Sequence, residues 1–177
     1  MTRRLYLCLP ATLAVLLATT SSAQAQRESR PCEPGRFYNI IAKHSAKAIG
    51  VLSGQLNDGA PLVQWDRNES EDQQWRCEDA GGGYFRLIDH HSGKVMNVKG
   101  GSRENGAALV QFAPTEGDND KWRLIRVEEG FYTIEAKHSG KVIGVLSGTT
   151  KNGAEIVQWD RDGSDNQKWQ FIEIPRR

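Results

Sequence analysis

Three histidine–serine pairs are the first candidates for chemistry in this chain of 177 residues: His44-Ser45, His91-Ser92 and His138-Ser139. A serine nucleophile needs a histidine base and an acid that orients the histidine, all in one asymmetric site. These pairs instead recur at equal spacing within short turn sequences, which favours turn chemistry over catalysis or a histidine metal triad. Paired catalytic carboxylates, a phosphate loop and a nucleophile elbow do not stand out either. The sequence therefore predicts a protein that is not an enzyme and needs no metal or cofactor.

The spacing of these pairs belongs to a repeat that covers most of the chain. A shift of 47 residues superposes the sequence on itself twice without a gap, which defines units 37–83, 84–130 and 131–177. The aligned tryptophans near the unit ends are Trp75, Trp122 and Trp169, and the aligned glutamines are Gln64, Gln111 and Gln158. We expect the three tryptophans in the core, because large buried aromatic side chains dominate such interiors.

Each unit has the pattern of short strands joined by turns. Apolar residues alternate in runs such as Tyr132, Ile134 and Ala136, and an Asp-Gly or Asn-Gly turn precedes the next apolar run. About four strands arise from each unit, and no segment carries a helical stripe. Three units that cannot bury their own apolar faces share a core by closing around a three-fold axis. The sequence thus predicts an all-β fold, a β-trefoil of about twelve short strands; a propeller is the alternative, but it typically needs four or more blades.

The ends of two units carry a recognisable motif. Gln73-Gln74-Trp75 and Gln167-Lys168-Trp169 form the Gln-x-Trp signature of the ricin-B-type lectin family, which this chain resembles from Phe37 to Ile174. The middle unit departs from the signature, with Asp120-Lys121-Trp122. The resemblance is to a divergent branch that occurs as stand-alone or appended modules. It implies a lectin with one shallow sugar pocket in each repeat.

The resemblance also implies which residues would bind sugar. It places an aromatic platform at Trp65, Phe112 and Trp159, whose faces could lie against the apolar side of a pyranose ring. It places a polar pair before each repeat-end tryptophan, where amide atoms could read the geometry of sugar hydroxyls. These pairs are Asp72-Gln73, Asn119-Asp120 and Asn166-Gln167. The third pocket keeps both amides and is expected to be best equipped, followed by the first.

One family position departs more seriously. Where an acidic residue usually follows the first hairpin, this chain has Gly50, Asn97 and Gly144. Glycine offers only its backbone to a sugar hydroxyl, whereas Asn97 retains a side-chain acceptor. That asparagine nevertheless belongs to the second unit, whose Gln became Asp, and this unit is expected to be the weakest.

The register of the strand glutamines leaves two interpretations. The family's glutamine usually precedes the platform by two residues, whereas here it precedes the platform by one. Either a bulge restores the match, or valines line the pockets and the glutamines are structural. The valines are Val63, Val110 and Val157.

The N-terminus reads as a signal peptide at residues 1–25. Arg3 and Arg4 precede an apolar stretch, and Ala23-Gln24-Ala25 provides a small-residue cleavage site. Cleavage near Ala25 would leave 152 residues, with a strap at 26–36 before a single domain at 37–177. We expect an exported protein, either extracellular or periplasmic.

Charge and cysteine content narrow the class of partner. Without the leader the chain has 21 basic and 22 acidic side chains, which are interspersed, so that nucleic-acid binding is disfavoured. No second hydrophobic run suggests membrane insertion. Cys32 and Cys77 remain, and in an exported protein they predict a disulfide, with two free thiols as the alternative.

The sequence supports two functions. Carbohydrate binding without catalysis is the leading hypothesis, with glycans or glycoconjugates as partners. The alternative is a protein-binding trefoil, such as a protease inhibitor or the docking subunit of a toxin, which Gly50 and Gly144 motivate.

Overall fold

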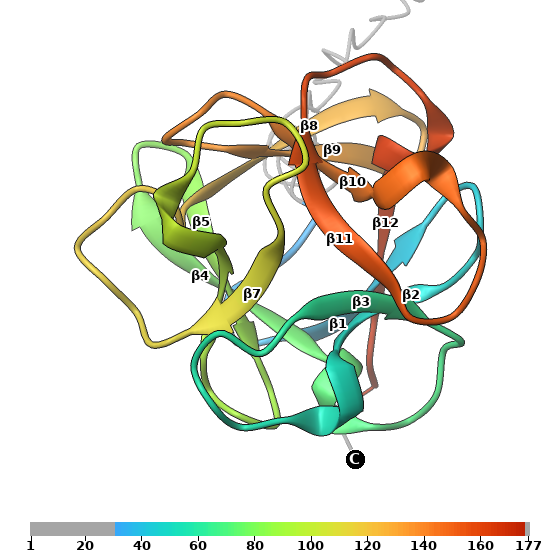
Figure 1. The fold of residues 1–177 in the computed structure, drawn as a ribbon. Helices are drawn as coiled ribbons and strands as arrows, with labels where there is room; N and C mark the ends of the chain where they lie inside the picture. The colour runs from blue at the N-terminus through green and yellow to red at the C-terminus, as the bar shows by residue number, and fades with distance from the viewer. Residues whose placement is uncertain (1–30, 176–177) are drawn as a thin grey trace, which may run out of the picture. The chain divides into compact units, whose positions relative to one another are not determined.

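The computed structural model describes residues 31–175 as twelve short strands joined by turns and single turns of 3-10 helix (Figure 1). The strands are β1 (Phe37–Ala42), β2 (Ala48–Val51), β3 (Leu62–Trp65), β4 (Trp75–Gly81), β5 (Tyr84–Asp89), β6 (Val95–Val98), β7 (Leu109–Phe112), β8 (Trp122–Glu128), β9 (Phe131–Ala136), β10 (Val142–Val145), β11 (Ala154–Trp159) and β12 (Trp169–Glu173). The 3-10 turns are η1 (Leu52–Gly54), η2 (Glu71–Gln73), η3 (Lys99–Gly101), η4 (Leu146–Gly148) and η5 (Asp165–Gln167). The signal peptide and residues 26–30 of the strap lie outside the described residues.

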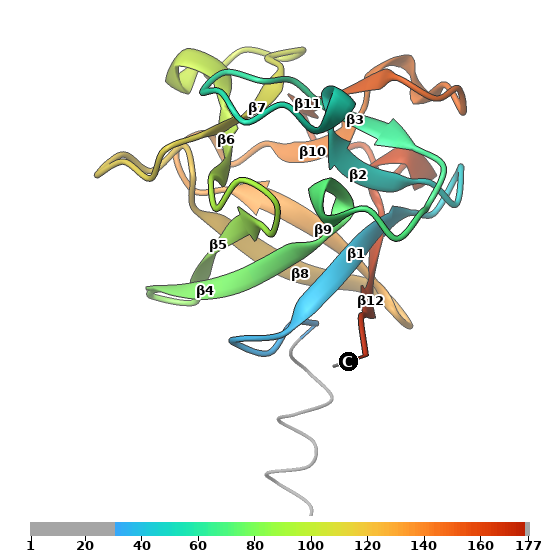
Figure 2. The same ribbon diagram turned by 90° about the horizontal axis from the view of Figure 1, so that it is seen from below.

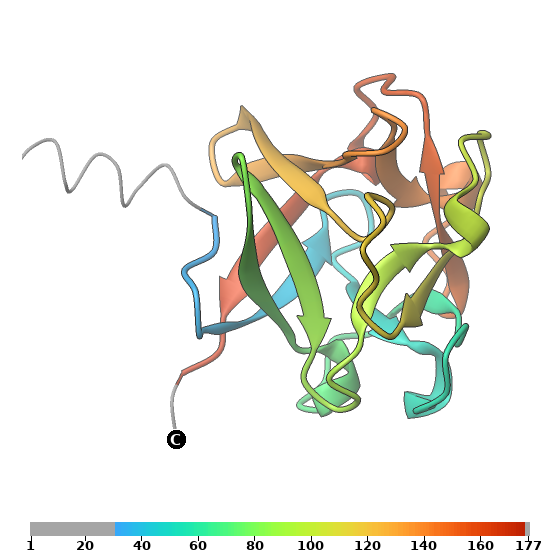
Figure 3. The ribbon, with the colours of Figure 1, turned by 90° about the vertical axis from the view of Figure 1, so that its left-hand side faces the viewer.

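Six of the strands close into a barrel. Strand β1 pairs with β4, β4 with β5, β5 with β8, β8 with β9, β9 with β12, and β12 again with β1, all antiparallel. The last pairing joins the first and third repeats, with Tyr38 opposite Glu173 and Ala42 opposite Trp169. Closure leaves the barrel ring without an unpaired edge. Figure 3 shows the β4–β5 hairpin on the near side of the molecule.

The other six strands form three hairpins that cover one end of the barrel. They are β2–β3, β6–β7 and β10–β11. Figure 1 looks onto β3, β7 and β11 around the centre of the molecule, and Figure 2 shows the hairpins above the barrel strands. The hairpins touch one another through β3–β11 and through the bridges Pro61–Val110 and Ala108–Val157. This is the β-trefoil that the repeat predicts.

The repeat-end tryptophans fix the core, as predicted. Trp75, Trp122 and Trp169 are each 0% exposed. Their indole N–H groups donate to the carbonyl oxygens of Ile49, Met96 and Ile143, at 2.9, 3.1 and 3.0 Å. Each tryptophan therefore ties the barrel of its repeat to the cap hairpin of the same repeat, and that junction lies directly beneath the candidate sugar sites.

The strap is joined covalently to the barrel. Cys32 forms a disulfide with Cys77 of β4, 45 residues along the chain, as the sequence predicts. Within residues 31–175, no helix has the length and apolar character needed to cross a membrane.

Candidate functional site

The three platform residues lie at the ends of β3, β7 and β11, and their side chains reach solvent. Trp65 is 43% exposed, Phe112 39% and Trp159 42%. The two tryptophan rings lie against Asn-Gly turns of neighbouring repeats: a Cβ placed on Gly153 would be 3.5 Å from Trp65 Cζ3, and one on Gly106 would be 3.3 Å from Trp159 Cζ3. Both glycines also have φ near +80° (81° and 83°), which a side chain disfavours. Each tryptophan platform is therefore packed against a glycine turn of a neighbouring repeat.

A pocket of about 290 Å³ lies beside the platform of the first repeat. Trp65 and Val63 of β3 line it, together with Gly50 and Val51 of β2 and with Ser70 and Asp72 at η2. The structure thus brings three residues predicted to bind sugar, Trp65, Asp72 and Gln73, to one pocket. The presence of Val63 on the wall decides between the two register interpretations in favour of the valine.

The strand glutamines are structural. Gln64, Gln111 and Gln158 are 0% exposed. Each accepts a hydrogen bond from the serine of its own His-Ser pair, and its amide nitrogen donates to two backbone carbonyls of a neighbouring repeat. The His-Ser pairs thereby serve the turn and the repeat interface; His44 and His138 also contact the carbonyls of Thr149 and Ser102. Residues 31–175 contain no group of three or more His, Cys, Asp or Glu side chains arranged to hold a metal ion.

The glutamines of the Gln-x-Trp motif are also used internally. Gln73 and Gln167 are 2% and 1% exposed. In the third repeat, Gln167 Oε1 accepts from the Asp162 N–H at 3.0 Å, and Nε2 donates to the Asp160 carbonyl at 2.9 Å. Gln73 makes the same two bonds with Asn68 and Asp66. These bonds hold the loop after the platform strand in shape. Gln73 also lines the first pocket, and sugar binding by Gln73 and Gln167 stays a prediction.

In the second and third repeats, the asparagine one residue earlier bonds to the valine that ends β6 or β10. Asn166 Nδ2 donates to the Val145 carbonyl at 3.1 Å, and its Oδ1 accepts from Ser164 Oγ at 2.6 Å. Asn119 Nδ2 donates to the Val98 carbonyl at 3.1 Å and to Asn97 Oδ1 at 2.9 Å. Asn97 is only 4% exposed, so the acceptor expected to bind sugar in the second repeat is already occupied by Asn119.

Carboxylates at the platform ends link neighbouring repeats. Asp66 pairs with Lys47 and with Asn152 of the third repeat, and these contacts hold its pKa below the ordinary value. Asp160 pairs likewise with Lys141 and Asn105, which lower its pKa. Both carboxylates therefore remain charged and order the backbone that follows the tryptophan platforms.

Comparison with known proteins places this geometry in a family. The family model described as "Ricin-type beta-trefoil lectin domain-like" matches residues 24–112 and 118–176. The chain belongs to this family. A search of curated protein sequences gave no match.

Solved structures agree with this ricin-type domain. The chain is 38% identical to ThreeFoil, a designed three-fold symmetric protein, with a TM-score of 0.77, covering 78% of this chain and 99% of that one. It is 35% identical to part of 1,3Gal43A, an exo-β-1,3-galactanase from Clostridium thermocellum, with a TM-score of 0.78, covering 81% of this chain but only 31% of the galactanase. The Rhizoctonia solani agglutinin shares the fold at 18% identity, with a TM-score of 0.73 over 80% of this chain and 97% of that one.

The glycines that replace the family's acidic residue have a steric reason in this ricin-type domain. A Cβ on Gly50 would lie 2.9 Å from Gln73 Cγ and 3.4 Å from Asp72 Oδ2, and one on Gly144 would lie 3.1 Å from Gln167 Cγ. The η2 and η5 turns thus pack onto bare backbone. In the first repeat, Asp72 of η2 lines the pocket beside Gly50.

We predict that Gly50→Ala lowers the free energy of unfolding by about 1–3 kcal/mol, because the added methyl group overpacks the contact with Gln73. Gly144→Ala should cost less, since its closest contact is longer. Urea unfolding of both variants measures the difference. Glu155→Ala, an exposed change in β11, is the control and should alter stability by less than about 0.5 kcal/mol. A Gly50→Ala protein as stable as the control would contradict this packing.

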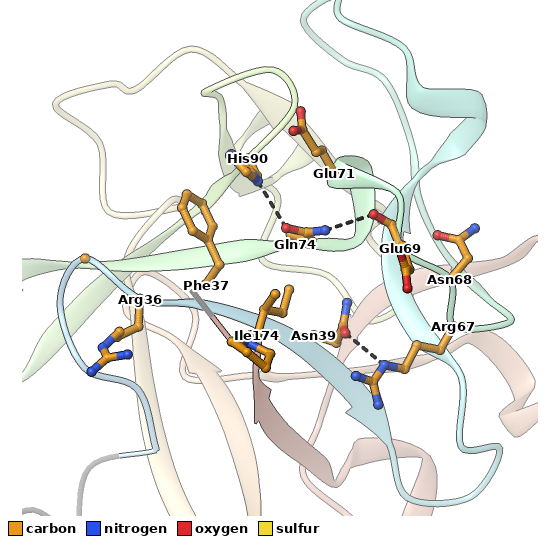
Figure 4. Close-up of a pocket in the computed structure, with 12 residues that line it drawn as sticks. Arg36, Phe37, Asn39, Arg67, Asn68, Glu69, Glu71, Gln74, His90 and Ile174 are labelled. Carbon is orange, nitrogen blue, oxygen red and sulfur yellow. Dashed lines mark hydrogen bonds between the residues drawn. The ribbon is translucent and has the colours of Figure 1, made fainter. Parts of the chain in front are cut away.

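A larger groove of about 790 Å³ shares Asn68 with the first-repeat pocket and lies between β1, the 67–71 loop and the start of the turn after β5 (Figure 4). The rings of Phe37 and His90 stack at 3.9 Å along one side, and Arg67 donates to Asn39 Oδ1 on the other. Gln74 lies between them and contacts His90 Nδ1 at 3.1 Å.

The sequence interpretation did not anticipate this groove, although the repeat carries a signal for it. In the 47-residue register, lysines occupy the places of Gln74 and His90 in the other repeats, and they form ion pairs with Asp118, Asp165 and Glu128. The lysines are Lys121 and Lys168, and Lys43 and Lys137. Loss of both lysines where the first repeat meets the second marks the place where the three-fold symmetry is broken.

Proposed function

We propose that the protein is an exported, non-catalytic lectin that binds glycans through the pockets of its first and third repeats. The observation that carries the proposal is the pair of tryptophan platforms, Trp65 and Trp159, each more than 40% exposed beside a polar side chain. An aromatic face of this kind suits the apolar side of a pyranose ring, while neighbouring polar groups bind its hydroxyls. Membership of a lectin-type family supports carbohydrate binding in general.

The polar groups beside the platforms favour these two repeats over the second. Asp72 has a carboxylate oxygen facing the first pocket, and Asn166 retains unused hydrogen-bonding capacity in the third. In the second repeat the platform is the smaller Phe112, and Asn97 and Asn119 bond to each other. We therefore assign sugar binding to repeats one and three.

The pockets are shallow, so each is expected to bind a single sugar weakly. A dissociation constant near 1 mM corresponds to about 4 kcal/mol, and simultaneous use of two pockets on a polyvalent glycan raises retention well above that of either one. β-1,3-Galactan oligosaccharides are a rational first probe, because the domain is 35% identical to part of an exo-β-1,3-galactanase. The disulfide fits export to an oxidising compartment.

The test is retention on a glycan array and on immobilised galactan, using residues 26–177. Trp159→Ala and Trp65→Ala should each weaken binding by about tenfold, because the loss of a stacking face is expected to cost about 1.4 kcal/mol. The double variant should fall to background, since both pockets are then gone. Phe112→Ala is the matched control and should keep most of the retention.

Thermal unfolding of every variant separates binding from stability, because all three platforms are partly exposed and their removal should leave the core intact. Undiminished retention by a folded double variant would contradict the site assignment. A blank array from the folded wild-type protein would contradict the lectin proposal and turn attention to a protein partner.

A further inference from the structure

The pockets of the first and third repeats differ by an exchange of one acid and one amide. The first has Asn68 on the loop and Asp72 at the base, whereas the third has Asp162 on the loop and Asn166 at the base. Each pocket region therefore carries one carboxylate, but at different depths. The surroundings of the two carboxylates determine what each pocket requires from a ligand.

In the third repeat the loop satisfies its own carboxylate. Asp162 Oδ1 accepts from the Ser164 N–H at 2.8 Å and from Ser164 Oγ at 2.5 Å, and these bonds lower the pKa of Asp162. At the base, Asn166 Nδ2 donates to the Val145 carbonyl. Asn166 thus supplies a donor to this carbonyl, while its Oδ1 shares the single hydroxyl proton of Ser164 with Asp162 Oδ1.

In the first repeat the base has two acceptors and lacks the corresponding donor. Asn119 and Asn166 each donate an amide N–H to the carbonyl of the valine that ends β6 or β10, but Asp72, which replaces them, has no side-chain N–H. Asp72 Oδ1 accepts from Ser70 Oγ, and Asp72 Oδ2 lies over Gly50. Among residues 31–175, no protein group donates a hydrogen bond to Oδ2. Val51, whose carbonyl corresponds to the bonded carbonyls of the other repeats, lines the same pocket.

The electrostatic surroundings of this base are also negative. Asp89 is 1% exposed, and alanine occupies its place in the other repeats, at Ala42 and Ala136. Burial raises the pKa of Asp89, and the charge of Asp72 acts in the same direction, with His91 opposing it. A positive group between Asp72 and the Val51 carbonyl would therefore offset negative charge in this part of the pocket.

We propose that the first-repeat pocket selects sugars that carry a free amino group, which binds as an ammonium ion between Asp72 Oδ2 and the Val51 carbonyl while the ring stacks on Trp65. An ammonium group supplies three N–H donors to these acceptors, and the tryptophan face attracts the positive charge. The third pocket, with an amide at its base, takes neutral sugars. This inference rests on the proposed lectin function and names the ligand class of one of its pockets.

The test compares glucosamine with glucose and N-acetylglucosamine by NMR titration of the two pockets separately. Trp159→Ala leaves only the first pocket, and Trp65→Ala leaves only the third. In the first pocket, glucosamine should bind at least about tenfold more tightly than either neutral sugar, and added salt should reduce the difference. In the third pocket the three sugars should bind alike.

Asp72→Asn within the Trp159→Ala background is the decisive variant. It installs the amide of the other two repeats, which can donate to the Val51 carbonyl, and should remove the preference for glucosamine while leaving the fold intact. Carboxylate and carbonyl oxygens are also calcium ligands, so the titrations are run in a chelator. A preference that disappears in the chelator, or that survives Asp72→Asn, would overturn the proposal.

The result separates this inference from the lectin function. Equal binding of charged and neutral sugars in the first pocket rejects the amino-sugar assignment and leaves the lectin intact. Failure of both pockets to bind any sugar rejects both.

Discussion

Replacing Cys32 and Cys77 together by alanine is expected to lower the free energy of unfolding by about 4 kcal/mol, as the chain-entropy model gives for a closed loop of 45 residues. The bridge joins the strap to β4, and both sulfurs are almost fully buried. Without it, the segment before β1 is attached only at one end, and the unfolded chain gains the freedom that the loop had removed.

Thermal unfolding measures this effect directly. For a domain of this size, a loss of about 4 kcal/mol corresponds to a fall in melting temperature of roughly 10 °C. A thiol reductant should reproduce the fall in the wild-type protein and leave the double variant unchanged. A wild-type melting temperature that does not move on full reduction would contradict the stabilising role of the bridge.

Much of the fold follows from the period of the sequence. The 47-residue shift aligns Trp75, Trp122 and Trp169, and the structure places all three fully inside, each bonded to a strand carbonyl of its own cap hairpin. Alternating apolar runs and Asn-Gly turns were sufficient to predict twelve strands, because those signals are local. Closure by β1 against β12 is not local, but three equal units leave few other ways to bury their apolar faces.

The candidate site was predictable in outline and not in detail. Trp65 and Asp72 line one pocket of the first repeat, and Trp159 is exposed like Trp65; their binding of sugar stays a prediction. The sequence did not predict that the Gln167 amide would bond to the backbone of Asp160 and Asp162 and close the loop between them. Such loop bonds depend on backbone atoms, and a sequence pattern shows only side chains.

The glycines and the larger groove illustrate two further limits. In the sequence, Gly50 is the loss of a side chain that would bind a sugar hydroxyl. The structure shows that a side chain at this position would collide with Gln73. The groove beside Phe37 and His90 is lined by residues of β1, of the 67–71 loop and of the segment after β12. No single segment of the sequence therefore predicts it. Alignment of the repeats could have indicated the groove, because Gln74 and His90 stand where the other repeats have lysine.

The strand glutamines point inward, and we expect their hydrogen bonds to stabilise the fold. Gln158 lies one residue before the Trp159 platform, and the structure turns it inward, where it is 0% exposed. Its Oε1 accepts from Ser139 Oγ at 2.9 Å, and its Nε2 donates to the carbonyls of Ser102 and Glu104 at 2.8 and 3.0 Å. One side chain therefore joins the turn of its own repeat to the η3 loop of the second repeat.

Gln158→Met is expected to cost about 3 kcal/mol of unfolding free energy, because a serine hydroxyl and two carbonyls each lose a partner at about 1 kcal/mol or more apiece. Methionine keeps a similar unbranched shape, so the loss reports the hydrogen bonds rather than a cavity. Gln55→Met, at an exposed position, is the matched control and should change stability by less than about 0.5 kcal/mol. Equal urea midpoints for the two variants would show that the repeats are held together by apolar packing alone. A lower midpoint for Gln158→Met would show that the strand glutamines fix how the cap hairpins, and hence the platforms, meet.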